Sequence, residues 1–445
     1  MIELCAVGGY NEVGKNMTAI KIDNEVIILD MGIHLDNYIR YTESEEEDIS
    51  NISVRELIKA EAIPDDSIIE KWRENVRAII PTHAHLDHVG ALIFLSNKYN
   101  ASILCTPLTA EVIKSISKDE KIKLKNNIKK LNVNSKYTLS RNITIEFINI
   151  THSIPQTVLV ALHTKSGTIL YANDFKFDNH PIIGKKPDYK RLEELGKRGV
   201  EVLICDCTKA KKATKTPSEL VAKEMLRDVM LGLNTKNKAV IVTTFASHLA
   251  RLKSIIEFGK KMNRKIVFLG RSLGKYAMAG ERAGVINFSK DVEIVKFGKQ
   301  IKKKLKKIEK HGRDKYLLVV TGHQGEPKST LVRMVNGILP FNFYMEDHVI
   351  FSCNVIPTKT NIENRTYLEK KLNQFGVRVF KDIHQSGHAS KEDLRELLNL
   401  IKPKHLIPAH GEPDMKMALV ELAIEKGYEL DKTVHIINNG DFLSI

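Results

Sequence analysis

The sequence lacks paired cysteines, long apolar runs and a basic N-terminal leader. Its five cysteines are scattered, with no CxxC spacing, which excludes a disulfide framework and a cysteine zinc site and is typical of a reducing compartment. No apolar run reaches the roughly 18 residues of a membrane helix, and Glu3 stands where a signal peptide carries basic residues. We therefore expect a cytoplasmic protein with no membrane partner.

What is present is a globular composition with a surplus of positive charge. The 445 residues are 42% hydrophobic and 28% charged, which suits about three domains, or two of which one is split. Lys and Arg number 69 against 54 Asp and Glu, a net charge of +15. This surplus suits a polyanion such as nucleic acid, but a solvated basic surface gives the same number. Both interpretations also apply to the lysine-rich helical patterns at 121–130 and 302–310.

The N-terminal part of the chain has a β-strand pattern. Alternating β-branched residues and glycine turns predict an antiparallel meander with strands at 2–7, 18–22 and 25–30. The stretch 37–75 differs in character because it contains the acidic run 45–48 and short helical patterns. We interpret it as a surface insertion.

The rest of the chain has the pattern of an α/β protein. From Val76 onward, short apolar strands repeatedly end in polar clusters, and α/β proteins build their sites at the carboxyl ends of strands. Strands alternate with helices at about 210–350, which predicts a separate parallel βα domain. A helix, a strand at 377–380, a second helix and a strand ending at His410 follow.

The strongest chemical signal is a dense cluster of histidine and aspartate. It reads THAHLDH at 82–88, where a buried strand ends and a helix begins. Side chains alternate in an extended segment, so His83, His85 and Asp87 project to one side, and His88 joins them from the helix. Imidazole and carboxylate groups suit zinc and similar divalent ions. The cluster therefore predicts ligands for two adjacent metal ions.

Three single residues share the strand-end position of this cluster. His152 follows one strand, Asp174 ends another in YAND, and His410 ends a third in IPAH. A lone histidine is more often structural than a ligand, but together these residues complete two ligand sets with Asp174 in both. The sets are His83, His85, His152 and Asp174 for one ion, and Asp87, His88, Asp174 and His410 for the other. Asp30 closes an earlier strand and is expected to support the metal loops as a hydrogen-bond acceptor.

These ligand motifs resemble, in the same order along the chain, those of the metallo-β-lactamase fold. The distance of 236 positions from Asp174 to His410 exceeds what one αββα domain needs. This resembles the β-CASP nucleases, where a second domain is inserted at this point. The resemblance implies an α/β fold in which an αββα metallo-β-lactamase domain, at 1–209 and 351–445, carries a parallel βα β-CASP domain at 210–350.

Within this group the sequence resembles the RNase J family. The matching motifs are EVGKNM at 12–17, TFAS at 244–247, GHQGEP at 322–327 and HQSGHAS at 384–390. His323 stands where bacterial members usually carry a small hydroxyl residue. The extra C-terminal domain of bacterial members is missing, so the chain resembles the shorter archaeal members. A homodimer is expected.

The resemblance also implies an activity. It predicts a ribonuclease that uses two divalent ions, zinc or alternatively manganese, to digest single-stranded RNA from a 5′-monophosphate end. Asp87 is implied as a catalytic residue. His388, oriented by Asp206, is implied as the group that donates a proton to the leaving ribose oxygen.

Two groups of residues are expected to bind RNA phosphates. A turn of small residues before a helix exposes backbone N–H groups that favour a terminal phosphate. Its residues are Ser386, Gly387, His388, Ala389 and Ser390. The inserted domain offers Ser247, His248, Arg271, Ser272 and Ser352, each of which is equally consistent with a helix cap or a turn residue.

Other functions remain open on sequence grounds. They are an endoribonuclease, a DNA-processing β-CASP nuclease, a small-molecule ester hydrolase on the same fold, and a non-catalytic RNA-binding scaffold. An ester hydrolase would need neither the inserted domain nor the basic surplus. The scaffold is disfavoured because all seven ligand positions are occupied. His410 at the last motif resembles the RNA-processing branch rather than the DNA-repair branch.

Overall fold

The computed structural model describes residues 1–44 and 53–445, which fold into two compact units. Unit 1 comprises Met1–Asn179, Lys185–Thr216 and Gly387–Ile445, and unit 2 comprises His180–Gly184 and Pro217–Ser386. The acidic run 45–48 of the predicted surface insertion lies outside the described residues. The domain limits expected from the sequence, 1–209, 210–350 and 351–445, remain a prediction, and the two units have different limits. Unit 2 extends to Ser386 because a helix and a strand beyond position 350 complete its sheet.

Unit 1 contains two sheets. The first has the order β19-β1-β2-β3-β4-β5-β6, and β1, β2 and β3 pair antiparallel, which confirms the predicted meander. Its strands are β1 (Ile2–Gly8), β2 (Met17–Ile22), β3 (Glu25–Leu29), β4 (Val76–Ile80), β5 (Ser102–Cys105), β6 (Ile128–Lys130) and β19 (Phe442–Ser444). The second has the order β18-β11-β10-β9-β8-β7. Its strands are β7 (Lys136–Thr138), β8 (Thr144–Asn149), β9 (Val158–Thr164), β10 (Gly167–Ala172), β11 (Val202–Asp206) and β18 (His405–Ala409).

The two sheets pack face to face because their apolar residues alternate along the strands. Leu4 and Ile20 of the first sheet join Phe147 and Val160 of the second in one buried cluster between the sheets. The outer face of the second sheet, including Leu203, packs against helices. These helices are α6 (Tyr189–Arg198), α13 (Lys391–Ile401) and α14 (Pro413–Glu425).

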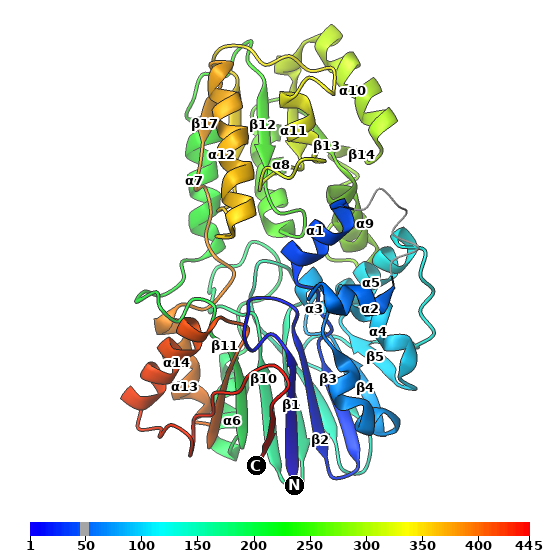
Figure 1. The fold of residues 1–445 in the computed structure, drawn as a ribbon. Helices are drawn as coiled ribbons and strands as arrows, with labels where there is room; N and C mark the ends of the chain where they lie inside the picture. The colour runs from blue at the N-terminus through cyan, green and yellow to red at the C-terminus, as the bar shows by residue number, and fades with distance from the viewer. Residues whose placement is uncertain (45–52) are drawn as a thin grey trace. The chain divides into compact units, whose positions relative to one another are not determined.

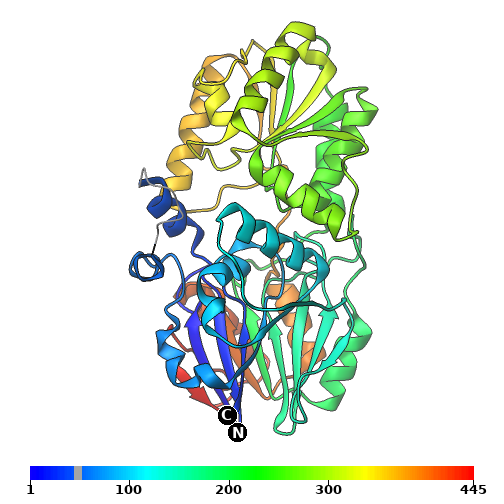
Figure 2. The same cartoon turned by 90° about the vertical axis from the view of Figure 1, so that its right-hand side faces the viewer.

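Helices also lie along the first sheet, so unit 1 is the predicted αββα sandwich (Figures 1 and 2). The helical segments between β3 and β6 in the chain are α1 (Leu35–Ser44), α2 (Val54–Lys59), the 3-10 segments Asp66–Asn75 and Ser96–Lys98, α3 (Leu86–Val89), α4 (Leu92–Leu95) and α5 (Pro107–Asp119). Among the residues that the structure describes, no helix has both the length and the apolar composition needed to cross a bilayer.

The helix predicted at 121–130 is wrong. The segment forms a loop and then β6 at the edge of the first sheet, where it pairs parallel with β5. The Asn126 side chain donates to three backbone carbonyls within 96–101 at 2.9–3.1 Å. These tertiary hydrogen bonds hold the segment extended and override the helical spacing of its lysines. Lysines on an edge strand also discourage pairing with another chain.

Unit 2 is the predicted parallel βα domain, with the strand order β14-β13-β15-β12-β16-β17 and parallel pairing throughout. Its strands are β12 (Val240–Thr243), β13 (Lys265–Leu269), β14 (Val292–Val295), β15 (Tyr316–Val320), β16 (His348–Phe351) and β17 (Arg378–Phe380). Its helices are α7 (Glu219–Leu231), α8 (Leu249–Lys261), α9 (Arg271–Arg282), α10 (Gly298–His311), the 3-10 segment Arg313–Lys315, α11 (Thr330–Val335) and α12 (Lys359–Gln374). The second lysine-rich pattern is therefore helical, as predicted.

Candidate metal centre

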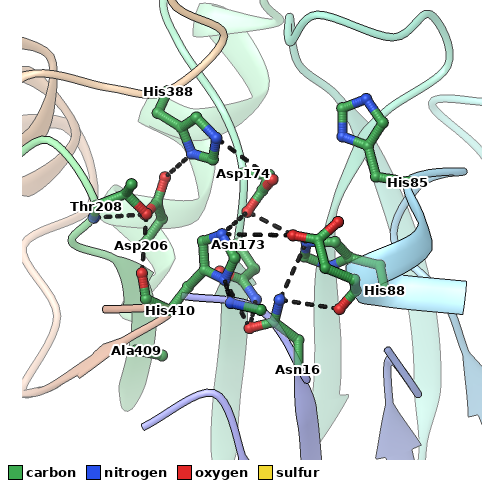
Figure 3. Close-up of polar contacts among 12 residues, drawn as sticks. Asn16, His85, His88, Asn173, Asp174, Asp206, Thr208, His388, Ala409 and His410 are labelled. Atoms are coloured by element: carbon green, nitrogen blue, oxygen red, sulfur yellow. Dashed lines mark hydrogen bonds and ion pairs between the residues drawn. The ribbon is translucent and has the colours of Figure 1, made fainter. Parts of the chain in front are cut away.

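The residues predicted as metal ligands gather at one edge of the unit 1 sandwich. In the second sheet β18, β11 and β10 run parallel, and β8 has the same direction because antiparallel β9 separates it from β10. His410, Asp174 and His152 follow the ends of β18, β10 and β8. The loop after β4 of the first sheet and helix α3 carry 83–88 to the same place, where His88 Nε2 lies 3.4 Å from Asp174 Oδ1 (Figure 3).

The backbone at this edge is strained. Asp30, Asp174 and His410 have φ angles of 60°, 54° and 54°, a left-handed conformation that residues with a β-carbon rarely adopt. Each such residue costs on the order of 1–3 kcal/mol, and such strain is concentrated at functional sites. The left-handed backbone at these three positions sets the direction in which each side chain leaves its strand end.

The first ligand group contains His83, His85, His152 and Asp174. His85 Nδ1 lies 3.0 Å from His83 Nε2 and 3.1 Å from His152 Nε2. Asp174 Oδ2 lies 3.5 Å from His83 Nε2 and 3.4 Å from His152 Nε2. The four ligand atoms lie within 4.8 Å of one another, so the structure brings this predicted set together.

The second group contains Asp87, His88, Asp174 and His410, and it uses the other oxygen of Asp174. Asp174 Oδ1 lies 3.4 Å from His88 Nε2 and 3.3 Å from His410 Nε2. Asp87 Oδ2 lies 3.6 Å from His88 Nε2 and 3.8 Å from His410 Nε2. The ligand atoms of this group are again within 4.8 Å of one another. Asp174 thus faces both groups, one oxygen to each.

The ligand atoms are spaced as ligands of a divalent cation, and two of them have no hydrogen-bond partner among the described residues. These two atoms, Asp174 Oδ1 and His410 Nε2, are buried. Zinc bonds to nitrogen and oxygen are about 2.0–2.1 Å long, so tetrahedral ligands of one ion stand roughly 3.3–3.4 Å apart. The 3.0–3.8 Å separations of both groups agree with this spacing.

Burial sets the protonation states in the first group. It lowers the pKa of His85 to about 4, and together with repulsion from His88 it holds the pKa of His83 well below its usual range. Burial alone would raise the pKa of Asp174, but attraction to His410 and His88 holds that pKa well below its usual range, and the Asp174 and Asp30 carboxylates in turn raise the pKa of His88 against the effect of burial. Neutral imidazole and ionised carboxylate are the forms that bind metals.

In His88 and His152, the ring nitrogen Nδ1 forms a hydrogen bond that fixes the direction of Nε2, the nitrogen that faces the cluster. His88 Nδ1 donates to Asp30 Oδ2 at 2.8 Å, and Asp30 Oδ1 accepts from the Thr82 backbone N–H at 2.7 Å. His152 Nδ1 donates to the Gly387 carbonyl at 2.8 Å. Asp30 therefore makes the supporting contact predicted from the sequence.

Asn16 is a supporting residue that the sequence analysis missed. Its side chain is buried; Oδ1 accepts from His410 Nδ1 at 2.9 Å, and Nδ2 donates to the Asp87 carbonyl at 3.1 Å (Figure 3). It belongs to the EVGKNM segment that carried the family resemblance. An asparagine in a loop has no spacing that indicates a ligand-positioning role, so that motif was the only available signal.

Asp206 and His388 form a separate pair beside the second group. Asp206 Oδ2 accepts from His388 Nδ1 at 2.9 Å, and Asp206 Oδ1 accepts from the Thr208 backbone N–H at 2.7 Å. His388 Nε2 lies 3.9 Å from Asp174 Oδ2. Burial alone would lower the pKa of His388, but the Asp174 and Asp206 carboxylates raise it to about 9. The ligand atoms of Asp206, His388 and His410, one from each residue, also lie within 4.8 Å of one another.

The predicted phosphate-binding turn is only partly open. His388 is half-buried, but Gly387 and Ala389 are buried, and Ser390 is a buried helix cap that forms a capping box with Asp393. The Ser390 backbone N–H already donates to Thr216 Oγ1 at 3.0 Å. Ser386 closes unit 2.

Two of the unit 2 candidates lie in a buried polar network. Ser352 Oγ accepts from Arg251 Nη1 at 2.8 Å, and His248 Nε2 lies 3.3 Å from Glu219 Oε2. Both candidates are buried. Their side chains form contacts inside unit 2 that hold the loops following β12 and β16. The candidates that are half-buried or exposed are Ser247, Arg271 and Ser272.

Sequence models of three families match successive parts of the chain. The Metallo-beta-lactamase superfamily matches residues 10–200. "Ribonuclease J, beta-CASP domain" matches residues 237–369. "Zn-dependent metallo-hydrolase RNA specificity domain" matches residues 376–436, which include His388 and His410.

Relatives and solved structures resemble the chain over almost all of its length. Ribonuclease J of Methanocaldococcus jannaschii is 43% identical over 100% of this chain and 98% of its own, and that of Pyrococcus abyssi is 44% identical over 100% and 97%. Ribonuclease J 1 of Streptococcus pyogenes is 33% identical over 99% of this chain and 74% of its own. A crystal structure of a protein of unknown function from Enterococcus faecalis shares the fold, with a TM-score of 0.65, 16% identity and 99% of each chain covered. The chain therefore belongs to the ribonuclease J family, in which a metallo-β-lactamase domain is combined with a β-CASP domain.

Proposed function

We propose that this chain is a two-metal ribonuclease that hydrolyses single-stranded RNA from the 5′ end and prefers a 5′-monophosphate. The observation that carries the proposal is the position of Asp174. One of its oxygens faces His83 and His152, and the other faces His88 and His410. A carboxylate shared in this way suits two adjacent ions, which is the arrangement used for in-line phosphoryl displacement.

The donor set favours zinc, with manganese as the alternative, because it combines several imidazoles with carboxylates. His83, His85, His152 and Asp174 would hold one ion, and Asp87, His88, Asp174 and His410 the other. When bound, such ions activate water near neutral pH and neutralise the charge that develops on the phosphate.

The protein's own contribution to bond cleavage is a proton. Water adds to phosphorus and releases one proton to the solvent, and the bond between phosphorus and the leaving ribose oxygen breaks. His388 donates the proton of Nε2 to that oxygen. Asp206 accepts a hydrogen bond from His388 Nδ1 at 2.9 Å, so the ring is oriented with Nε2 pointing away from Asp206. The hydrogen bond from the Thr208 backbone to Asp206 keeps this carboxylate in place.

The direction of digestion depends on where a terminal phosphate binds. We assign this role to the turn at Ser386, Gly387 and His388, which precedes the positive end of the α13 dipole. Ala389 and Ser390 shape this turn from inside the core. Ser247, Arg271 and Ser272 are proposed as further phosphate contacts, whereas His248 and Ser352 act through the buried network that positions their loops.

The decisive experiment compares RNA ends. Wild-type protein is loaded with zinc or manganese and given RNA with a labelled 5′-monophosphate, the same RNA with a 5′-triphosphate, and a circular form. We expect mononucleotides from the monophosphate substrate, slow digestion of the triphosphate substrate and no cutting of the circle. Equal cutting of the circle would make the enzyme an endoribonuclease.

Variants assign the roles of single residues. Asp87→Ala and His388→Ala should each lose at least about 100-fold in kcat, the size of effect typical of losing a catalytic group. Asp228→Ala is the matched control, because the Asp228 side chain is 77% exposed on α7. Single-stranded DNA and a nitrophenyl ester, assayed in parallel, test the DNA-processing and ester-hydrolase alternatives; faster turnover of either than of RNA would replace this proposal.

The expected homodimer and cytoplasmic location stay predictions. Sedimentation equilibrium over a range of protein concentrations tests the first, and fractionation of cells that produce the protein tests the second. A monomer at all concentrations would reject the dimer.

A further inference from the structure

The net positive charge of this protein comes from one of its two units. Unit 2 contains 32 Lys and Arg against 15 Asp and Glu, a net charge of +17, whereas unit 1 contains 37 against 39, a net charge of −2. The two values add to the net charge of +15 for the whole chain. The surplus therefore belongs to the inserted unit and not to the unit that holds the metal-ligand cluster.

Helix α10 carries the densest part of this charge. Its sequence, GKQIKKKLKKIEKH, contains seven lysines. Lys304 pairs with Glu293 at 2.5 Å, and the single carboxylate of the helix, Glu309, accepts from the Asn342 backbone N–H at 3.0 Å. The other six lysines are exposed, and among the described residues no carboxylate lies within 4.0 Å of their ammonium groups. They are Lys299, Lys302, Lys303, Lys306, Lys307 and Lys310.

Four of these lysines form a row. Lys299, Lys303, Lys306 and Lys310 are three or four positions apart, so successive members lie on one helix face with β-carbons about 5–6 Å apart. The row spans roughly 16 Å, from the rise of about 1.5 Å per residue. Lys302 and Lys307 flank it. The helix therefore presents a line of unneutralised charges rather than scattered ones.

An exposed aromatic residue precedes the helix, two positions before the first lysine of the row. Phe297 is the N-cap residue of α10, and 53% of it is exposed to solvent. Single-stranded nucleic acids are held by basic grooves that follow the backbone together with aromatic rings on which bases stack. A duplex hides its base faces, so the combination of a bare phenyl ring and a lysine row favours a single strand.

The opposite face of α10 is fixed in the core. Ile301, Leu305 and Ile308 are buried and join the cluster that contains Leu318 of β15. A membrane-surface helix needs a free apolar face to insert beneath the lipid headgroups, and α10 has none to offer. The helix is also a rigid platform, because this packing holds it against the sheet (Figure 1).

We propose that the row Lys299, Lys303, Lys306 and Lys310, with Phe297 at its head, is a binding surface for single-stranded RNA. The inference rests on the proposed function only in taking RNA as the ligand. The lysines contact phosphates, and the phenyl ring stacks on a base. The surface holds the body of a long substrate, so it affects the affinity for long RNA and not the hydrolysis of a short one.

The test measures binding of oligouridine of about 30 nucleotides by fluorescence anisotropy at several salt concentrations. In K299Q/K303Q/K306Q/K310Q, glutamine keeps the helix propensity, and circular dichroism checks the fold. We expect Kd to rise at least about tenfold, and the slope of log K against log salt to fall by about 2 to 3, since each lost phosphate contact removes about 0.7. Phe297→Ala should weaken binding about fivefold or more.

The matched control removes the same charge elsewhere in unit 2. K238Q/K260Q/K261Q/K381Q changes four lysines that each form an ion pair with a carboxylate at 2.6–3.2 Å. It should change Kd by less than about twofold, because charges already paired release few counterions on binding. An equal loss in both quadruple variants would assign the effect to net charge and overturn the proposal, as would unchanged binding in the row variant.

Two further readouts separate this inference from its rivals. If the row variant loses affinity for phosphatidylserine vesicles while keeping its affinity for RNA, the surface is a membrane contact and the proposal fails. Hydrolysis of a 5′-monophosphorylated tetranucleotide should proceed at the same rate in wild type and row variant. If the wild type does not hydrolyse it, the proposed function fails, whereas the binding comparison still decides the RNA surface.

Discussion

Asn16 Oδ1 accepts a hydrogen bond from His410 Nδ1 at 2.9 Å, which links the loop between β1 and β2 to the end of β18 across 394 positions of sequence. The same side chain donates to the Asp87 carbonyl. One amide therefore orients an imidazole and a carboxylate-bearing loop of the second ligand group. Asn16 acts on the second ligand group in two ways: it sets the direction of His410 Nε2, and its Nδ2 lies 3.2 Å from His88 Nε2.

Asn16→Ala should weaken metal binding by about 10- to 100-fold, the usual cost of losing a group that orients a metal ligand. Asn16→Asp keeps the acceptor oxygen and should recover part of the affinity. Competition with a zinc indicator measures the effect without reference to RNA hydrolysis. Asn263→Ala, in the turn after α8, is the control. Unchanged zinc affinity in Asn16→Ala would show that His410 is held by its backbone alone.

Gly387 allows the backbone to approach His152 closely. A β-carbon at this position would lie 2.8 Å from His152 Cε1 and 2.9 Å from its Nδ1. Gly387→Ala should therefore displace the imidazole from the first ligand group and reduce both zinc affinity and RNA hydrolysis by at least about tenfold. Gly298→Ala is the control, because the nearest atom to its added β-carbon is a side-chain nitrogen at 3.8 Å. Full activity of Gly387→Ala would mean that His152 is not a ligand.

Replacement of Asp206 should change the pH dependence of hydrolysis. The Asp174 and Asp206 carboxylates raise the pKa of His388 to about 9 against the effect of burial. A proton donor is lost as pH rises through its pKa, so activity should fall on the alkaline side. Asp206→Asn removes one negative charge, which lowers the pKa of His388 and moves this fall to lower pH. The measurement is kcat/KM between pH 6 and about 10. An alkaline limb at the same pH in both proteins would exclude His388 as the donor.

The clustering of the candidate metal ligands was predictable from the sequence because these residues follow two simple rules. The side chains of 83–88 cluster by local spacing, and His152, Asp174 and His410 share a position at strand ends, where parallel strands bring them to one edge. Both rules act through the backbone and need no knowledge of packing.

What the sequence could not give depends on tertiary contacts. Asn16 and the Gly387 carbonyl act on partners far along the chain, and neither residue type has a spacing that signals such a role. The lysines of 121–130 have helical spacing, but hydrogen bonds from Asn126 hold the segment extended. Ser352 has the composition of a phosphate contact and is buried beneath Arg251.

The network around Arg251 gives a test of stability that is independent of catalysis. Arg251 is fully buried in unit 2, forms a bidentate pair with Glu219 at 2.6 and 2.8 Å, and donates to the Ser352 carbonyl at 2.9 Å and to its hydroxyl at 2.8 Å. Arg251→Met removes the guanidinium from the buried Glu219 carboxylate and leaves it with His248 Nε2 at 3.3 Å. It should lower the free energy of unfolding of unit 2 by about 3–5 kcal/mol.

The measurement must report unit 2, and the single tryptophan, Trp72, lies in unit 1. Urea unfolding is therefore followed by circular dichroism, and hydrogen exchange is measured in peptides that contain β12 and β16. Exchange should accelerate there in Arg251→Met, whereas the exposed control Arg227→Ala should change stability by less than about 0.5 kcal/mol. E219M/R251M removes both charges and should regain part of the loss, because a buried ion pair replaced by apolar groups of similar size is often neutral. If amide hydrogens in these peptides exchange as slowly in Arg251→Met as in the wild type, the network does not hold the loops of Ser352 and His248. That result would reject the assignment of these two residues as positioning residues.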